Sequence, residues 1–212
     1  MFVLNVTGAP GSGKTWICHE LQRLGMGDKV KCIDIDDYVI RVIREGLKDK
    51  TFSGKESVLP RVNQLLAEKI ETYRKKNTNV VLVSVMPMYH GDSFIFLKIP
   101  TQELQKTYRR MLLRELKKIT TNAHEIEKTI KSFPVHDVST GVNLAAGLMA
   151  SDIGLTFDDY VASYLAQEND MTNSQFPVMT QKQVMNKIKT MVKTSEKDHK
   201  KDKDKGKGKS KT

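Results

Sequence analysis

Short apolar runs alternate with amphipathic segments in the first part of the chain. Four runs have the length and composition of buried strands, namely residues 2–6, 29–34, 80–85 and 94–99. Apolar residues recur at helical spacing in the segments that follow them, namely residues 16–24, 38–43, 59–75 and 101–119. Gly25 and Gly46 are expected to end the first two helices. This alternation predicts a three-layer α/β fold, in which a mostly parallel sheet carries helices on both faces.

The second part of the chain gives a weaker pattern. Helical spacing returns in residues 123–131, 157–166 and 180–192, and the rest of residues 135–177 has no clear periodicity. From Lys193 onward there is no apolar side chain, so this segment cannot offset the entropy that is lost on ordering. We therefore expect one domain over residues 1–192 and a disordered Lys-rich tail over residues 193–212.

Charge and cysteine content bear on partners and compartment. The net charge is +10, and the tail supplies half of it through nine lysines against four acidic residues. Such a tail either contacts nucleic acid weakly, or binds another anionic surface, or only solvates the chain. Cys18 and Cys32 lack metal-ligand spacing and are expected to be buried free thiols. Without a signal peptide or a run long enough to span a bilayer, we expect a soluble protein of the reducing cytoplasm.

The sequence Gly-Ala-Pro-Gly-Ser-Gly-Lys-Thr at residues 8–15 matches the phosphate-loop motif in full. It follows a predicted strand and precedes a predicted helix, as such a loop requires. The expected nucleotide-binding residues are Gly8, Ala9, Pro10, Gly11, Ser12, Gly13, Lys14 and Thr15. Their backbone N–H groups surround phosphate oxygens, the Lys14 ammonium reaches the β- and γ-phosphates, and the Thr15 hydroxyl ligates a metal. The motif therefore predicts ATP and Mg²⁺ as cofactors.

Three carboxylates, Asp34, Asp36 and Asp37, follow the second predicted strand. Strand alternation is expected to turn Asp34 and Asp36 to the same side of the sheet, at the mouth of the nucleotide cleft. One carboxylate then holds Mg²⁺, and the other accepts the proton of an attacking hydroxyl. The structural alternative is that Asp36 or Asp37 caps the helix that begins near Tyr38. The two roles are compatible, since only one carboxylate is needed as the cap.

The phosphate loop followed by Asp34-Ile35-Asp36 resembles the small P-loop kinases, a group that includes shikimate, gluconate, nucleoside and nucleoside-monophosphate kinases. The resemblance covers about the first 120 residues and implies a P-loop NTPase-type sheet. It casts Asp34 as the metal-side carboxylate and Asp36 as the base on the acceptor side. The third predicted strand carries no Walker B aspartate, a feature shared with shikimate-type members. The chain also lacks the Asp-Gly-x-Pro-Arg-like segment expected of nucleoside-monophosphate kinases.

A weaker resemblance connects Asp36-Asp37-Tyr38 with phage-type polynucleotide 5′-kinases, and it implies Asp36 as the base and Arg41 as a phosphate clamp. A basic cluster lies in the helix predicted after the fourth strand, where such kinases place a lid over the triphosphate. Its members are Arg109, Arg110 and Arg114. An arginine there would neutralise charge on the transferred phosphoryl group, and the alternative is a solvated helix face.

These features lead to one main hypothesis and two alternatives. The main hypothesis is an ATP-dependent kinase that moves the γ-phosphoryl group to a small hydroxyl- or phosphate-bearing acceptor, such as a nucleoside, a nucleotide or a small metabolite. The first alternative is a polynucleotide 5′-hydroxyl kinase. The second belongs to another class, a P-loop NTPase that uses the nucleotide as a switch or binding signal.

Overall fold

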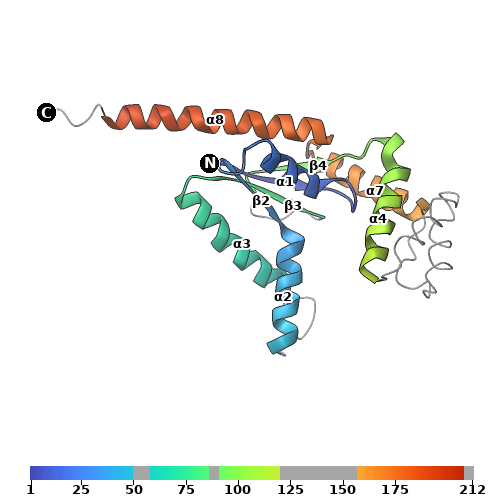
Figure 1. Cartoon of the computed structure of the whole chain (residues 1–212). Helices are drawn as coiled ribbons and strands as arrows, with labels where there is room; N and C mark the ends of the chain where they lie inside the picture. The colour runs from blue at the N-terminus through green and yellow to red at the C-terminus, as the bar shows by residue number, and fades with distance from the viewer. Residues whose placement is uncertain (50–57, 86–90, 120–156, 208–212) are drawn as a thin grey trace. The chain divides into compact units, whose positions relative to one another are not determined.

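In the computed structural model, the described residues are 1–49, 58–85, 91–119 and 157–207 (Figure 1). Five strands form one sheet, namely β1 (Val3–Thr7), β2 (Val30–Asp34), β3 (Asn79–Ser84), β4 (Ser93–Leu97) and β5 (Val178–Met179). Their order is β2-β3-β1-β4-β5, and the pairs β1/β3, β1/β4 and β2/β3 are parallel. The four predicted strands are confirmed, with small shifts at their ends.

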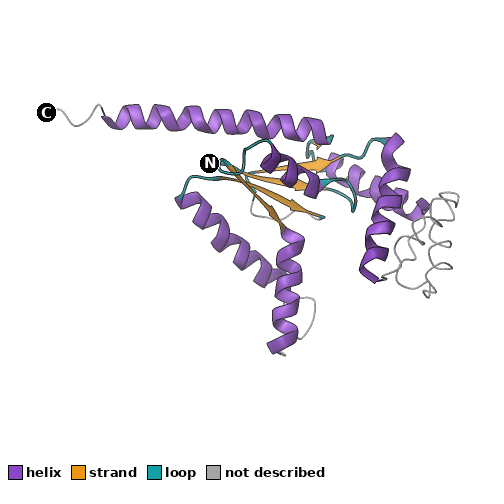
Figure 2. Cartoon of the chain, in the orientation of Figure 1, coloured by secondary structure: helices purple, strands orange, loops and turns teal. Residues whose placement is uncertain are grey.

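Helices make up most of the remaining described chain (Figure 2). They are α1 (Lys14–Arg23), α2 (Ile35–Asp49), α3 (Val58–Lys75), the 3-10 helix η2 (Thr101–Glu103), α4 (Leu104–Ile119), α7 (Phe157–Asn173) and α8 (Gln181–Lys207). The parallel sheet with helices around it confirms the predicted α/β fold class. The helix expected at residues 123–131 lies outside the described residues.

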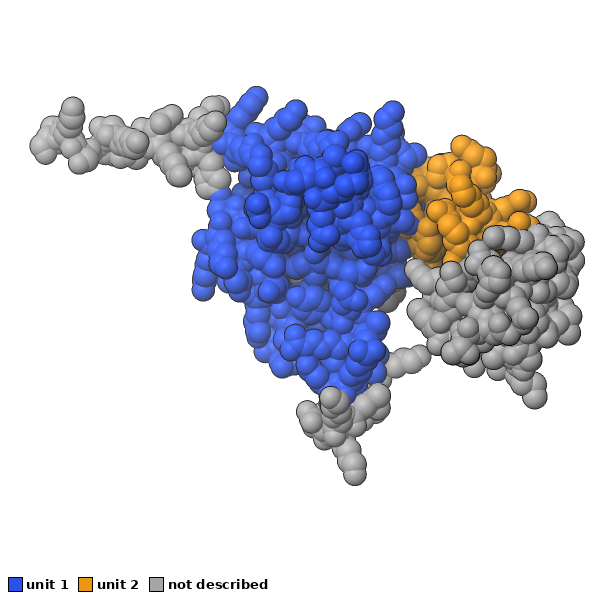
Figure 3. Space-filling model, in the orientation of Figure 1, with its two compact units in different colours: residues 1–8, 13–97, 179–212 blue, residues 9–12, 98–178 orange. Residues whose placement is uncertain are grey.

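The chain divides into two compact units (Figure 3). Unit 1 consists of Met1–Gly8, Gly13–Leu97 and Met179–Thr212, and unit 2 of Ala9–Ser12 and Lys98–Val178. The residues of the phosphate-loop sequence are therefore divided between the two units. We call Ala9–Ser12, which groups with unit 2, the front segment, and residues 13–15, which group with unit 1, the back segment. That residues 1–192 form a single domain stays a prediction.

Helices cover both faces of the sheet in unit 1. On one face, Leu4 of β1 belongs to a buried cluster with Ile17 of α1 and Ile188 of α8. On the other face, Val3 belongs to a cluster with Leu66 of α3 and with residues of α2. Successive residues of β1 thus enter opposite cores, as the two-residue period of a strand requires. This double burial explains why the strands read as continuous apolar runs.

Aromatic residues pack together in the described part of unit 2. Tyr108 of α4 is fully buried, and its ring centroid lies 5.5 Å from the ring centroids of both Phe157 and Tyr160 of α7. One turn further along α7, the Tyr164 hydroxyl accepts a hydrogen bond from the backbone N–H of Ile99 at 3.1 Å. These contacts hold α7 against α4 and against the chain that leaves β4.

Three helices run past the ends that the sequence predicted, and α7 continues from the predicted end at residue 166 to Asn173. α2 continues through Gly46 to Asp49, so the prediction that Gly46 ends it is wrong. A glycine inside a helix costs only about 1 kcal/mol relative to alanine, which the packing of α2 in the apolar cluster with α3 can offset. α8 extends to Lys207, so residues 193–207 are helical where a disordered tail was predicted. Lysine and glutamate are good helix formers, and α8 extends a helix already anchored in the core.

Candidate phosphate-binding site

The phosphate loop begins where β1 ends, at the topological switch point of the sheet. β1 pairs with β3 on one side and with β4 on the other, and the chain leaves β1 toward α1 and β2. In open α/β sheets, ligands bind outside the carboxyl ends of strands at such a point. The order of the strands therefore places residues 8–15 where a bound phosphate is expected.

The back segment presents the amino-terminal end of α1. Gly13 precedes the helix with φ 94°, a left-handed conformation that glycine adopts without strain. Lys14 is buried, and its Nζ donates a hydrogen bond of 2.6 Å to the carbonyl oxygen of Gly8. The ammonium thus lies beside the residue at which the loop begins. A helix amino terminus with an adjacent ammonium is a site that favours anions.

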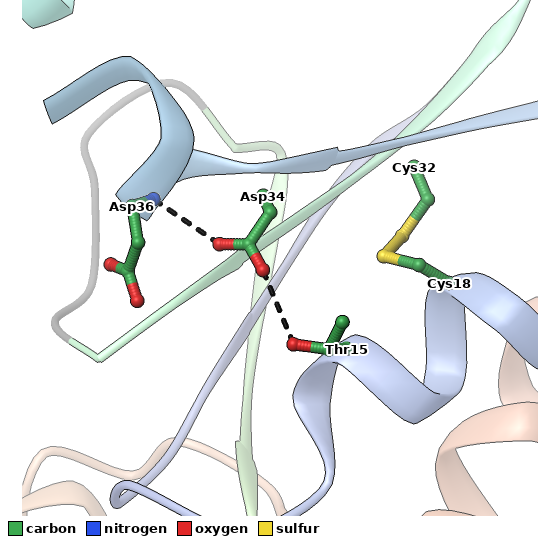
Figure 4. The surroundings of a disulfide bond; sticks show 5 residues. All are labelled: Thr15, Cys18, Cys32, Asp34 and Asp36. Carbon is green, nitrogen blue, oxygen red and sulfur yellow. Dashed lines mark hydrogen bonds between the residues drawn. A yellow bond between two sulfur atoms is a disulfide. The ribbon is translucent and has the colours of Figure 1, made fainter. Parts of the chain in front are cut away.

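Thr15 and Asp34 meet between α1 and the end of β2 (Figure 4). The Thr15 hydroxyl donates a hydrogen bond of 3.2 Å to Oδ2 of Asp34. The other carboxylate oxygen of Asp34, Oδ1, accepts the backbone N–H of Asp36 at 3.2 Å. The structure therefore brings together the two residues that the sequence predicted to hold the metal. Their role as ligands stays a prediction.

The same contacts correct the account of Asp36. We expected strand alternation to turn Asp34 and Asp36 to one side, but α2 begins at Ile35, so Asp36 lies in the first turn of a helix. Asp34 rather than Asp36 or Asp37 accepts the hydrogen bond that caps this helix. Asp36 is exposed at the carboxyl end of β2, which leaves its carboxylate accessible to an acceptor molecule.

Burial acts on the ionisation of Asp34. The pKa of this carboxyl is raised, first because partial burial disfavours the charged form and further because the Asp36 and Asp37 carboxylates lie close by. The hydrogen bonds from the Asp36 N–H and the Thr15 hydroxyl act in the opposite direction. A cation bound here would relieve this cost, since it would favour the ionised carboxylate.

The donors fit magnesium. Mg²⁺ is usually held by one or two carboxylates together with water and substrate phosphates, rather than by an all-protein cage. A hydroxyl at Thr15 and a carboxylate at Asp34 match that pattern. Among the described residues, no group of three or more His, Cys, Asp or Glu side chains is placed to hold a metal. Water or phosphate oxygens would complete the coordination.

Cys18 and Cys32 form a disulfide, so the prediction of free thiols is wrong (Figure 4). Cys18 lies one turn after Thr15 on α1, and Cys32 lies two residues before Asp34 on β2. Their Cα atoms are 5.3 Å apart, within the range that a disulfide spans. The bond therefore joins the same two elements that the Thr15–Asp34 hydrogen bond joins. It also removes one of the grounds on which a reducing compartment was expected, namely the two unpaired thiols.

The front segment is a tight turn. The Ser12 N–H donates to the carbonyl of Ala9 at 3.1 Å, Pro10 occupies the second position, and Gly11 has φ 81° at the third. These are the hydrogen bond, the proline and the positive φ of a type II turn. A Cβ on Gly11 would lie 2.8 Å from the methyl group of Thr107, so α4 approaches this glycine closely. Glycine is required here both for its backbone angle and for its size.

A second helix of unit 2 also contacts the front segment. The hydroxyl of Tyr160 on α7 donates a hydrogen bond of 3.0 Å to the carbonyl oxygen of Pro10. Burial raises the pKa of Tyr160 to about 12, although the Arg110 charge acts to lower it. The phenol therefore stays protonated and able to donate at any ordinary pH.

The three predicted lid arginines lie on α4. Arg110 is exposed, and its guanidinium donates at 3.2 Å to the hydroxyl of Thr107, the same residue whose methyl group lies close to Gly11. Arg109 is partly buried, and the side chain of Arg114 lies outside the described residues. Arg41, the clamp implied by the polynucleotide-kinase resemblance, pairs with Glu45 on the surface of α2. The catalytic roles of these arginines stay predictions.

Sequence reasoning missed three residues that contact the loop, namely Thr107, Tyr160 and Gln181. A Cβ on Gly13 would overlap the side-chain amide of Gln181, the first residue of α8. The start of α8 does carry a signal: Thr180 and Gln183 form a reciprocal capping box, in which Oε1 of Gln183 accepts the Thr180 N–H at 2.8 Å. The capping box predicts where α8 begins, but it does not predict that this residue lies beside the phosphate loop.

Within the described residues, no helix is long and apolar enough to cross a membrane. No protein-family model matches the chain, and no curated protein matches it either. Among solved structures, a gluconokinase from Sinorhizobium meliloti 1021 matches with a TM-score of 0.34 and 11% identity, over 82% of this chain and 97% of the other. The protein APE1195 matches with a TM-score of 0.32 and 21% identity, over 69% of this chain and 95% of the other. Both matches are too distant to assign a family.

Proposed function

We propose that this chain is an ATP-dependent phosphotransferase that moves the γ-phosphoryl group of ATP to a small hydroxyl- or phosphate-bearing acceptor. The observation that carries the proposal is the group formed by Lys14, Thr15 and Asp34 at the amino terminus of α1. It combines an ammonium at the first residue of the phosphate loop with a hydroxyl and a carboxylate in contact. Phosphoryl transfer depends mainly on such positioning and charge stabilisation.

The proposed reaction breaks the bond between the γ-phosphorus and the oxygen that bridges it to the β-phosphate, and forms a bond from the acceptor oxygen to that phosphorus. ADP leaves with the electron pair of the broken bond. Lys14 would stabilise the negative charge on the β- and γ-phosphate oxygens. When the acceptor is a hydroxyl, its proton would pass to the exposed carboxylate of Asp36, and Arg110 would bind the transferred group.

Mg²⁺ would be held by the Thr15 hydroxyl and the Asp34 carboxylate together with the nucleotide. Its contribution when bound is to neutralise charge on the β- and γ-phosphates. The Thr15 hydroxyl and the Asp34 carboxylate are in hydrogen-bond contact, which places both near a shared cation. We further propose that the acceptor is a nucleoside, a nucleotide or a small metabolite, and that the Lys-rich end of α8 adds at most a weak contact with nucleic acid.

A transfer assay tests the proposal. The purified chain is incubated with ATP, Mg²⁺ and a panel of nucleosides, nucleotides, sugar acids and 5′-hydroxyl oligonucleotides, and labelled product is measured alongside ADP. We expect product with a small acceptor, and loss of product in Lys14→Ala. The matched control is Lys29→Ala, because Lys29 forms only an exposed pair with Glu196.

Three results would contradict the proposal in different ways. Failure to bind ATP or ADP would reject the whole nucleotide assignment. ADP release that no acceptor accelerates would favour the NTPase switch instead. Product formed only from oligonucleotides, with steep salt dependence, would favour the polynucleotide kinase.

A further inference from the structure

Two tyrosines on one face of α7 differ in what they hold. Tyr160 and Tyr164 are separated by one helical turn, both are 2% exposed, and both use the hydroxyl in hydrogen bonds to backbone. Tyr164 contacts Ile99, which follows β4. Tyr160 instead contacts Pro10, 150 residues earlier in the chain and inside the front segment. Only one of the two therefore acts on the phosphate loop.

The carbonyl that Tyr160 holds belongs to the central peptide of the turn. Type I and type II turns share the same first and last residues and differ mainly by a flip of the peptide between the second and third positions. In the front segment that peptide joins Pro10 to Gly11. Glycine at the third position allows either orientation, so the turn by itself does not fix which way this peptide points.

The orientation matters because a trans peptide is planar, with its C=O and N–H pointing in opposite directions. A hydrogen bond that holds the Pro10 carbonyl toward Tyr160 therefore directs the Gly11 N–H to the opposite side. A phosphate loop depends on N–H groups that point inward to the anion. A flipped peptide would present a carbonyl oxygen to the phosphate, which repels it.

We propose that Tyr160 is a positioning residue that fixes the Pro10–Gly11 peptide, so that the Gly11 N–H is oriented for phosphate before the nucleotide arrives. The inference rests on the proposed function only in that the loop must bind a phosphate ligand. The methyl group of Thr107 restricts the space at the Cα of Gly11, where an added Cβ would lie 2.8 Å from it. Tyr160 acts through the backbone and touches no substrate itself.

The test compares Tyr160→Phe with Tyr164→Phe in the full-length chain. Each variant removes one buried hydroxyl from α7. Tyr164→Phe should lose at least as much thermal stability as Tyr160→Phe, because the Tyr164 hydroxyl both accepts from and donates to the backbone of Ile99, whereas the Tyr160 hydroxyl donates to Pro10. Dissociation constants are measured for ADP and for inorganic pyrophosphate, which has phosphates but no base or sugar. For Tyr160→Phe we expect both constants to rise by the same factor, about three- to tenfold, which is the scale of one lost hydrogen bond. For Tyr164→Phe we expect both to stay near the wild-type values.

A second measurement does not depend on nucleotide binding. Hydrogen exchange of the peptide that contains residues 9–12 should be faster in ligand-free Tyr160→Phe than in Tyr164→Phe. Equal binding and equal exchange in the two variants would overturn the role of Tyr160, even if the wild type binds ADP. A wild type that binds neither ADP nor pyrophosphate would instead reject the proposed function, and the exchange result would still decide the role of Tyr160 in holding the turn.

Discussion

The front and back segments of the phosphate loop adjoin in sequence but are held by different interactions. The back segment is held by charge and covalent structure: Lys14 binds the Gly8 carbonyl, Thr15 contacts Asp34, and a disulfide joins α1 to β2. Among the interactions of the front segment are two neutral ones, the close approach of Thr107 on α4 and the hydrogen bond from Tyr160 on α7. The comparison suggests a division of work, in which the back segment provides the charges for chemistry and the front segment sets the geometry for binding.

The largest expected effect comes from removing charge in the back segment. Lys14→Ala should lower kcat by about 10²- to 10³-fold, the scale of one lost electrostatic donor at a transition state. A front-segment change such as Tyr160→Phe should mainly raise KM for ATP. Steady-state kinetics with varied ATP checks this contrast. The division of work is wrong if both variants lower kcat and leave KM unchanged.

Removing the disulfide is the second largest change. The double variant Cys18→Ala/Cys32→Ala should lose about 3 kcal/mol of unfolding free energy, the scale expected for a loop of this size, since the two cysteines are separated by 14 residues. Chemical denaturation measures the loss. A reductant should produce a similar loss in the wild type and none in the double variant. If the reductant lowers the unfolding free energy of both proteins equally, loss of the disulfide is not the cause of the lower stability.

Substituting Gly11 tests how closely α4 approaches the front segment. Gly11 and Gly25 both have positive φ, 81° and 67°, but a Cβ at Gly25 would meet nothing within 4 Å. Gly25→Ala should therefore cost only backbone strain, about 1–2 kcal/mol. Gly11→Ala should cost more, because of the overlap with Thr107, and should also weaken ADP binding. Thermal melts and ADP titrations of the two variants provide the measurement, and equal losses would argue against a close approach of α4.

The smallest expected effect concerns Asp34 in the ligand-free protein. Because folding raises its pKa, the stability linked to this group is fully present below the unfolded pKa and is lost as the pH rises through the folded pKa. Asp34→Asn removes that loss. The Tm of the variant relative to the wild type should therefore be higher at neutral pH than in acid. A difference that does not vary with pH would contradict the raised pKa.

The outcome for the sequence predictions follows from how local each signal is. The motif at residues 8–15 and the buried strands depend on neighbours in sequence, and the structure has both. The predicted cap of α2 was Asp36 or Asp37, but the helix starts directly after β2, so Asp34 is its cap. For the same reason Asp36 lies in the helix and does not follow the alternation of the strand. Tyr160, Thr107 and the Cys18–Cys32 bond bring together residues distant in sequence, or on different elements, and no periodicity of a single chain encodes such contacts.

The disulfide also affects how the protein should be handled. It lies beside Thr15 and Asp34, so a buffer that contains a thiol and one that lacks it would hold two covalent forms of the molecule. Activities measured in the two buffers would then belong to different molecules, even at identical sequence and concentration. Purifications intended for nucleotide titration should therefore record the number of titratable thiols with each preparation.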